Sequence, residues 1–395
     1  MSVELQHPMK AEATPDEVAR GRFVSGMRSL ILNDLAADMR SAYDRRAAPA
    51  FAKQHGHEPQ TSREAHQALR GDPAFNIYSA MRVQAQKMVW ASVAESVERE
   101  SARLAAEAQA VSDLDGSLKL DPALDVPKNV HAIDVHLMPG SYTRGADSLE
   151  AGAVYDRGLA VFSMGLMGAN LDDIGLSMSQ YIKLRFPDFA PTRILDTGCT
   201  VGHNTLPWKQ AYPQAQVHAI DAAPGPLAYA SARAKMQGQD VAFHQMCADD
   251  LAYGDESFDV VWSSMFLHEL SKKQRAKCFD EAYRVLKPGG LLLHMELPPN
   301  DQMGAFDGFY LDWDSYYNNE PYYKGYRDEV PRDLCTRAGF GESEYFDFVV
   351  PSISIYGEQA VADAAKGDRA EGVGQETTGR LAEGVMWYGF GAWKK

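Results

Sequence analysis

Two stretches in the first third of the chain carry a helical hydrophobic pattern. Apolar residues recur at intervals of three and four positions in residues 23–39 and again in residues 75–104. This spacing places apolar side chains along one face of a helix. The Gly- and Pro-containing residues 55–59 interrupt the pattern between them. We therefore expect residues 1–127 to form a helical N-terminal module that ends in an Asp-, Pro- and Gly-rich linker, residues 113–127.

Residues 128–192 form a second, mixed segment. Within it, residues 130–137 alternate partly between apolar and polar types, which predicts a short strand. Residues 150–185 return to a helical pattern that is unusually rich in Gly and Met. Because Met side chains fill irregular space, these helices suit either an adaptable core or a mobile cover.

From residue 193 onward, strand-like and helix-like segments alternate, which is typical of a doubly wound α/β sheet. The segments that read as strands are residues 193–196, 217–221, 241–244, 258–262, 291–296, 344–349 and 385–391. The sequence therefore predicts an α/β fold with a seven-stranded, Rossmann-like sheet in residues 193–395. The Gly-, Ala- and acid-rich residues 357–383 are expected to be exposed or partly disordered.

Composition narrows the kind of partner. The 395 residues include 39 Lys and Arg against 54 Asp and Glu, a formal net charge of −15. Nucleic-acid affinity depends largely on Lys and Arg, so this balance argues against a nucleic-acid partner. The four Cys residues form no Cys-x-x-Cys pair, and neither a signal peptide nor a run of roughly 18 apolar residues is visible. We therefore expect a soluble, cytoplasmic protein with no membrane partner.

The ends of the first two predicted strands carry candidate ligand-binding residues. The first strand runs into a Gly-containing turn that starts at Asp196, and the second strand ends at Asp221. Ligands of open α/β sheets bind at these carboxyl ends, where an acid accepts hydrogen bonds from ribose hydroxyls. Thr200 stands at the second glycine position of the dinucleotide motif G-x-G-x-x-G, so a nicotinamide cofactor and a dehydrogenase are disfavoured. A nucleoside cofactor without a phosphate fits better; the alternative is a tight turn without a ligand.

Two further motifs follow in the same part of the chain. Residues 247–259 read CADDLAYGDESFD, and residues 284–290 read RVLKPGG. With the turn and Asp221, they make residues 193–298 resemble a class I S-adenosylmethionine-dependent methyltransferase, in particular its ubiquinone-biosynthesis methyltransferase-like branch. The resemblance implies a methyltransferase sheet and S-adenosylmethionine as the cofactor.

The resemblance also implies which residues hold that cofactor. Asp196 and two glycines would line its methionine part, Asp221 would hold the ribose, and Asp249 would face the adenine. Thr200 departs from the family's usual central glycine, and Cys247 stands where an acid is common. The full expected set is Asp196, Gly198, Cys199, Thr200, Gly202, Asp221, Ala222, Ala248, Asp249, Ser264 and Met265.

His268 and Glu296 are the candidate catalytic residues. His268 follows the fourth strand and Glu296 ends the fifth, so both belong to the same edge of the sheet. The pair resembles plant-type small-molecule O-methyltransferases, in which a matching His deprotonates a hydroxyl. The alternative is that His268 only packs or supports the cofactor loop. His131 and His136 lie before the core and are expected to be structural.

Aromatic residues are concentrated in an expected insertion, residues 301–330, after the fifth strand. Aromatic walls suit a flat apolar acceptor, and the interleaved acids suit a cation. A self-packed lid or a dimer contact is the alternative. The expected substrate-binding residues are Tyr155, Trp313, Tyr316 and Tyr317.

We therefore expect S-adenosylmethionine-dependent methyl transfer to a small-molecule hydroxyl, with a thiol or an amine acceptor as the alternative. A non-catalytic protein that binds the cofactor is the alternative of another class. By the same resemblance, the N-terminal module is expected to cover the acceptor site or to form a homodimer, and residues 128–192 to lie over the cofactor site. His55 and His57 lie in a Pro-flanked loop without a cluster of Cys or acidic residues, so no metal is expected.

Overall fold

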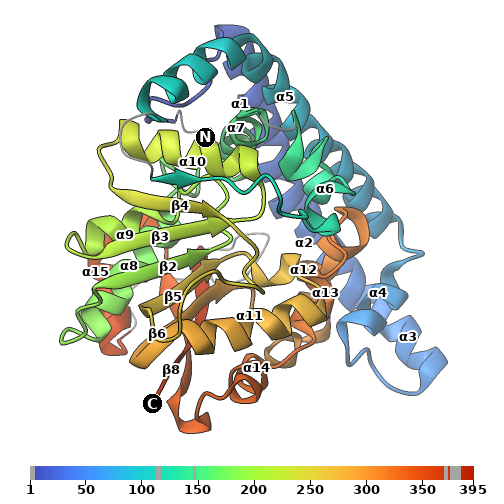
Figure 1. Ribbon diagram of the computed structural model, residues 1–395. Coiled ribbons are helices and arrows are strands. Elements are labelled where there is room, and N and C mark those ends of the chain that lie inside the picture. Colours follow the sequence, from blue (N-terminus) through green and yellow to red (C-terminus); the bar gives the residue numbers. More distant parts are fainter. Residues whose placement is uncertain (1–4, 113–116, 146–147, 369–371, 374–383) are drawn as a thin grey trace.

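The computed structural model describes residues 5–112, 117–145, 148–368, 372–373 and 384–395, and it has three layers around one sheet (Figure 1). Helices cover both faces of the sheet, and the N-terminal helices lie along its side, with α5 as the longest of them. The predicted α/β class with a helical N-terminal region is confirmed.

Among the described residues the sheet has eight strands, in the order β1-β4-β3-β2-β5-β6-β8-β7. All pairs are parallel except those of β8, which runs antiparallel to β6 and β7. Seven strands correspond to the predicted segments. Six agree with them to within a few residues, and β6 also includes the predicted turn. The eighth, β1, lies in the expected linker and pairs with β4 at the sheet edge. The bounds are β1 Leu118–Lys119, β2 Arg193–Thr197, β3 Gln216–Asp221, β4 Val241–Gln245, β5 Phe258–Ser264, β6 Leu286–Glu296, β7 Tyr345–Pro351 and β8 Met386–Trp393.

Each face of the sheet has its own hydrophobic core. Buried side chains of one face pack against α8 (Asp173–Arg185), α9 (Leu206–Ala211), α10 (Pro224–Met236) and α15 (Ile353–Lys366). The other face packs against α11 (Lys272–Val285), α13 (Tyr323–Arg327) and α14 (Pro331–Ala338). The strand order reverses between β2 and β5, so the carboxyl ends of these two strands open the crevice where ligands of such sheets bind.

The N-terminal module is one long, interrupted helix followed by the short helix α4 and the long helix α5. Its elements are α1 (Pro15–Leu30), η1 (Ile31–Leu35), α2 (Ala36–Ala42), η2 (Tyr43–Ala47), α3 (Ala48–His55), α4 (Ser62–Leu69) and α5 (Pro73–Ser112). Thr14 caps α1 in a reciprocal capping box with Glu17, and Gly56 ends α3 at a φ of 83°. The break predicted at residues 55–59 is therefore confirmed.

This module shares its core with the rest of the chain. Val24 of α1 and Val93 of α5 pack in one cluster with Val154 of α7 and Tyr229 of α10. Because the apolar face of α5 is covered by other parts of the chain, the described parts of residues 1–127 and 193–395 form one packed body.

Residues 128–192 differ from the prediction in one respect. In place of the strand expected at 130–137, the chain forms the short helix α6 (Lys128–His131) and a 3-10 turn, η3 (Val135–Leu137). His136 and Leu137 both have a φ of 56°, which no strand allows. The strand prediction is wrong because this backbone is held by side chains of α5 instead of by a sheet edge.

The predicted Gly- and Met-rich helices exist as α7 (Glu150–Phe162) and α8. Met178 of α8 is fully buried in the core, whereas Met164 and Met167, between the two helices, line the main cavity. Methionines of this segment therefore serve both as core and as cavity wall. Of the segment 357–383, residues 357–366 belong to α15, and most of the remainder lies outside the described residues.

Candidate active site

A cavity of about 1710 Å³ opens at the carboxyl ends of β2 and β5. Pockets for a single small ligand usually measure about 300–1,000 Å³, so this one has room for a cofactor and an acceptor. Its walls come from α1, α5, α7, the strand ends of the sheet, and α12 (Ala305–Tyr317). The N-terminal module thus contributes directly to the cavity through residues such as Arg28, Gln86 and Trp90.

The turn after β2 approaches the cavity with its backbone. Gly198 has a φ of 76°, and a Cβ added there would lie 2.2 Å from Cδ2 of Phe266. Only glycine combines this conformation with so close an approach. Thr200 adopts a left-handed φ of 49°, so it keeps the turn conformation at the expense of backbone strain.

Asp221 at the end of β3 holds this turn in place. One carboxylate oxygen accepts a hydrogen bond from the amide of Thr200 at 2.9 Å, and the other accepts one from the amide of Ala223 at 2.9 Å. Each oxygen keeps a further lone pair for a hydroxyl. The geometry suits a ribose at this carboxylate.

Asp196 at the end of β2 is buried beside the same turn. Its carboxylate accepts a hydrogen bond from the hydroxyl of Thr205 at 2.5 Å. Burial raises the pKa of Asp196 to about 7, against the opposing effect of the Thr205 bond, and the charge of Asp221 adds to the increase. A cationic ligand group beside Asp196 would favour its ionised form.

The structure places ten of the eleven expected cofactor residues in the cavity lining. They are Asp196, Gly198, Cys199, Thr200, Asp221, Ala222, Ala248, Asp249, Ser264 and Met265. Gly202 is the exception: a Cβ added there would meet Ala230 at 3.3 Å and Phe243 at 3.4 Å. Gly202 packs the turn closely against α10 and β4, and its contact with the cofactor stays a prediction.

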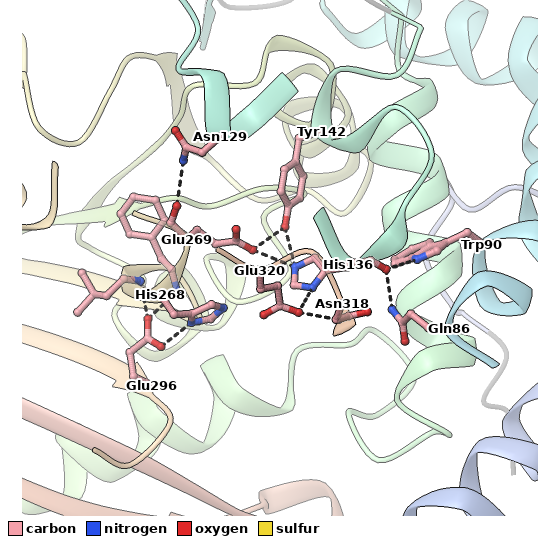
Figure 2. A network of polar contacts seen from close by, with 12 residues as sticks. Gln86, Trp90, Asn129, His136, Tyr142, His268, Glu269, Glu296, Asn318 and Glu320 are labelled. Carbon is pink, nitrogen blue, oxygen red and sulfur yellow. Dashed lines mark hydrogen bonds and ion pairs between the residues drawn. The ribbon is translucent and has the colours of Figure 1, made fainter. Parts of the chain in front are cut away.

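His268 and Glu296 form a buried pair at the edge of the cavity (Figure 2). His268 Nδ1 lies 2.8 Å from Oε2 of Glu296, and the two side chains are 2% and 0% exposed. The other carboxylate oxygen of Glu296, Oε1, accepts hydrogen bonds from the backbone amides of Phe266 at 2.7 Å and Leu267 at 2.5 Å. These bonds fix the orientation of the ring, and Nε2 points away from Glu296.

The surroundings of His268 favour its charged form. Burial lowers the pKa of the imidazole, but the charge and hydrogen bond of Glu296 outweigh burial, and Glu269 and Glu320 add to the increase. The resulting pKa of His268 is about 9. At neutral pH the ring therefore carries two protons in the protein without ligands.

A second histidine, His136, also lines the cavity, which the sequence did not indicate. Its ring contacts Glu320 through Nδ1 at 2.8 Å and Glu269 through Nε2 at 2.9 Å (Figure 2). Tyr142 donates a hydrogen bond to the same oxygen of Glu269. No motif or local spacing marks His136, because its partners lie far away in the sequence and meet it only in the folded chain.

Of the expected acceptor-binding residues, Tyr155 lines the cavity but Trp313, Tyr316 and Tyr317 do not. Trp313 is buried, where its ring nitrogen donates to the hydroxyl of Ser79 and its ring stacks under Arg82. Tyr317 contacts His66 of α4. These three aromatic side chains attach the insertion to the N-terminal module and do not face the cavity.

The fold and this site define a class of protein. A strand-end acid, a glycine turn that a Cβ would block and a second acid at β3 fit a nucleoside cofactor without phosphates. Residues 194–290 match the family model of a methyltransferase domain. This part of the chain is a class I S-adenosylmethionine-dependent methyltransferase domain, and S-adenosylmethionine is the cofactor that its residues fit.

Named relatives are similar over the same region. The demethylmenaquinone methyltransferase of Thermus thermophilus is 38% identical over 117 residues, which cover 30% of this chain and 52% of the relative. A malonyl-[acyl-carrier protein] O-methyltransferase from a Methylovorus species is 35% identical over 123 residues, 30% of this chain and 41% of the relative. The chain thus spans about half the length of the curated relatives it matches.

Solved structures of methyltransferases align with part of the chain at low sequence identity. An N-methyltransferase from Haemonchus contortus, in complex with S-adenosylhomocysteine, aligns with a TM-score of 0.42 and 18% identity. The alignment covers 62% of this chain and 59% of that one. A likeness of this degree carries no argument about the acceptor. No helix in the described part of the chain is long and apolar enough to cross a membrane.

Proposed function

We propose that this protein transfers a methyl group from S-adenosylmethionine to a hydroxyl of a small molecule. The observation that carries the proposal is the buried His268–Glu296 pair, whose free ring nitrogen faces a cavity with room for two ligands. When bound, the cofactor supplies an activated methyl group for in-line displacement. Holding both reactants in line contributes about 7–11 kcal/mol toward the barrier in well-oriented systems.

His268 handles the proton of the acceptor. A hydroxyl attacks the methyl carbon well only when its proton leaves, and Nε2 of His268 is the group that receives it. Glu296 keeps Nδ1 protonated and stabilises the imidazolium that forms. The proton thus moves from the acceptor oxygen to Nε2 of His268. The bound cofactor would supply the methyl group to that oxygen by cleavage of its sulfonium bond.

The remaining walls select the acceptor. Tyr155 and residues of the N-terminal module line the same cavity as the cofactor turn. In this proposal the module covers the acceptor and residues 128–192 cover the cofactor. Homodimer formation and a cytoplasmic location stay predictions.

An amine acceptor is the second candidate. Glu269, Glu296 and Glu320 line the cavity against two histidines, His136 and His268, and the surplus carboxylate favours a cationic ligand. An acceptor screen that compares phenols and alcohols with amines and thiols separates the two candidates.

Cofactor binding is tested by calorimetric titration with S-adenosylmethionine and S-adenosylhomocysteine, with NAD as the control. We expect micromolar binding of the first two and none of NAD. If protein that is free of bound S-adenosylhomocysteine gives no heat of binding with either S-adenosylmethionine or S-adenosylhomocysteine, the proposal is contradicted.

The role of His268 is tested by His268→Gln. We expect turnover to fall by about 10²–10⁴-fold with cofactor affinity unchanged, because a general base typically contributes that factor. His131→Gln is the matched control, since His131 is exposed and outside the cavity lining. Unchanged turnover in His268→Gln would refute the base.

Turnover of the wild-type protein should also depend on pH. The neutral form of His268 is the reactive one, so the rate should rise about tenfold per pH unit toward pH 9 and then level off. A rate that is constant between pH 6 and pH 9 would contradict this assignment.

A further inference from the structure

The backbone at His136 is held in an unusual conformation. His136, Leu137 and Ser141 have φ values of 56°, 56° and 50°, in the left-handed region that side chains rarely adopt. Such residues are strained and persist where the surroundings enforce their conformation. Here the carbonyl of His136 accepts hydrogen bonds from Nε2 of Gln86 at 3.0 Å and Nε1 of Trp90 at 2.8 Å, both on α5.

This conformation directs the ring of His136 toward the cavity. Each of its two ring nitrogens is within hydrogen-bond distance of a carboxylate oxygen, from Glu320 or Glu269. Both nitrogens therefore carry protons, and the ring is an imidazolium. Glu320 accepts a further hydrogen bond from Asn318 at 2.6 Å. The carbonyl of Glu269 accepts one from Asn129 at 2.9 Å. Four separate segments therefore meet at His136.

Two of these segments carry glutamates whose charges act on His268. Glu269 follows His268 directly in η5 (Leu267–Glu269), and Glu320 comes from the insertion after α12. Glu296 contacts one side of the His268 ring, and the network of His136 lies toward the other side (Figure 2).

We propose that His136 is a positioning residue of the methyl-transfer site, whose imidazolium holds Glu269 and Glu320 in place and sets the charge around His268. This inference rests on the function proposed for His268. His136 with its two carboxylates carries a net charge of −1; without the imidazolium the same group carries −2.

Titratable and charged groups surround His268 and the backbone next to it, and they come from several elements. The carboxylates of three glutamates favour its charged form, and the ring of one tyrosine packs against it with centroids 5.1 Å apart. One arginine of α11 donates to the carbonyl of Leu267, and itself pairs with Glu329. These groups are Glu296 (β6), Glu269 (η5), Glu320 (after α12), Tyr323 (α13) and Arg275 (α11).

Two substitutions change this charge in opposite directions. His136→Asn removes the imidazolium while an Asn still tolerates the left-handed backbone, so the negative charge near His268 grows. Glu320→Gln removes one carboxylate, so the negative charge falls. Nearby charges of this kind shift a pKa by about one unit or more. The first variant should raise the titration midpoint of His268, and the second should lower it.

The experiment is an NMR pH titration of the His268 ring in the full chain without an acceptor, with His268→Gln identifying the signal. We expect shifts of about one pH unit, upward for His136→Asn and downward for Glu320→Gln, a tenfold change in the neutral fraction at a given pH. Tyr142→Phe is the control, because it removes a hydrogen bond of this network but no charge. Its midpoint should stay near that of the wild type.

Shifts in the same direction, or none in both variants, would overturn the proposal. If His136→Asn does not fold, an unchanged midpoint in Glu320→Gln overturns it by itself. The pH–rate profiles of the same variants distinguish the two proposals. A shifted titration with an unshifted rate profile would contradict the role given to His268 and support the charge role of His136.

Discussion

At the scale of single residues, positive φ values mark the site. Thr200, Met265 and His136 are non-glycine residues in the left-handed region, and all three line the cavity. Strain of this kind concentrates where a backbone must present a group to a ligand. The family resemblance implied the first two as site residues, but nothing in the sequence indicated the third.

Gly198→Ala tests the close approach of the turn. Both a positive φ and a Cβ only 2.2 Å from Phe266 oppose an alanine there. Gly238→Ala is the matched control, since Gly238 has a φ of 67° and no described atom within 4 Å of an added Cβ. We expect the control to cost about 1–2 kcal/mol of unfolding free energy, and Gly198→Ala clearly more, with loss of cofactor binding. Equal costs in urea unfolding would contradict this account.

At the scale of elements, α5 connects the segment around His136 with α12. Gln86 and Trp90 hold His136, while Arg82 on the same helix reaches Asp314 of α12. Arg82 and Asp314 are both buried, and Arg82 also lies 4.0 Å above the ring of Trp313. The helix was evident from its hydrophobic period, but its polar contacts were not, because periodicity identifies only the buried face.

Arg82→Ala should weaken this connection strongly. Removing one partner of a buried ion pair leaves an uncompensated charge, at a cost of about 3–5 kcal/mol. The control is Arg46→Ala, which breaks the pair of the 60% exposed Arg46 with Asp72 and should cost less than about 1 kcal/mol. Urea unfolding of both variants measures the difference. Similar losses in the two would show that burial does not govern these pairs.

At the scale of the whole molecule, the first described residues also anchor the fold. His7 lies 2.9 Å from a carboxylate oxygen of Asp156 on α7, and the hydroxyl of Tyr229 contacts the same oxygen. Tyr155, the neighbour of Asp156, lines the cavity. The chain is therefore packed from Leu5 onward against α7, whose residue Tyr155 lines the cavity.

This anchor predicts an acid-sensitive step. Burial raises the pKa of Asp156, but the charge and hydrogen bond of His7 outweigh it and hold the pKa at about 2. Because the folded pKa lies below the unfolded one near 4, the stabilisation is complete above pH 4 and is lost as the pH falls toward 2. Between pH 4 and pH 2, the unfolding free energy of the wild type should fall by about 2 kcal/mol more than that of Asp156→Asn. Urea unfolding at several pH values measures this, with Asp38→Asn, an exposed site, as the control.

The sequence by itself determined the sheet and the cofactor half of the site. Strand patterns and the residues that follow them are local, and the carboxyl ends of parallel strands meet wherever such a sheet forms. Asp196, Asp221 and the His268–Glu296 pair were therefore predictable from strand ends alone. Only the eighth strand differed from expectation in this half.

The tertiary structure alone decided the side of the cavity around His136. His136, Gln86 and Glu320 lie on three distant segments with no shared motif, and apolar packing of α5 and the insertion brings them together. Such packing depends on the shape of whole faces and leaves little trace in any short stretch of sequence. For the same reason the aromatic residues near Trp313 looked like an acceptor wall, but in the folded chain they fasten the insertion to the N-terminal helices.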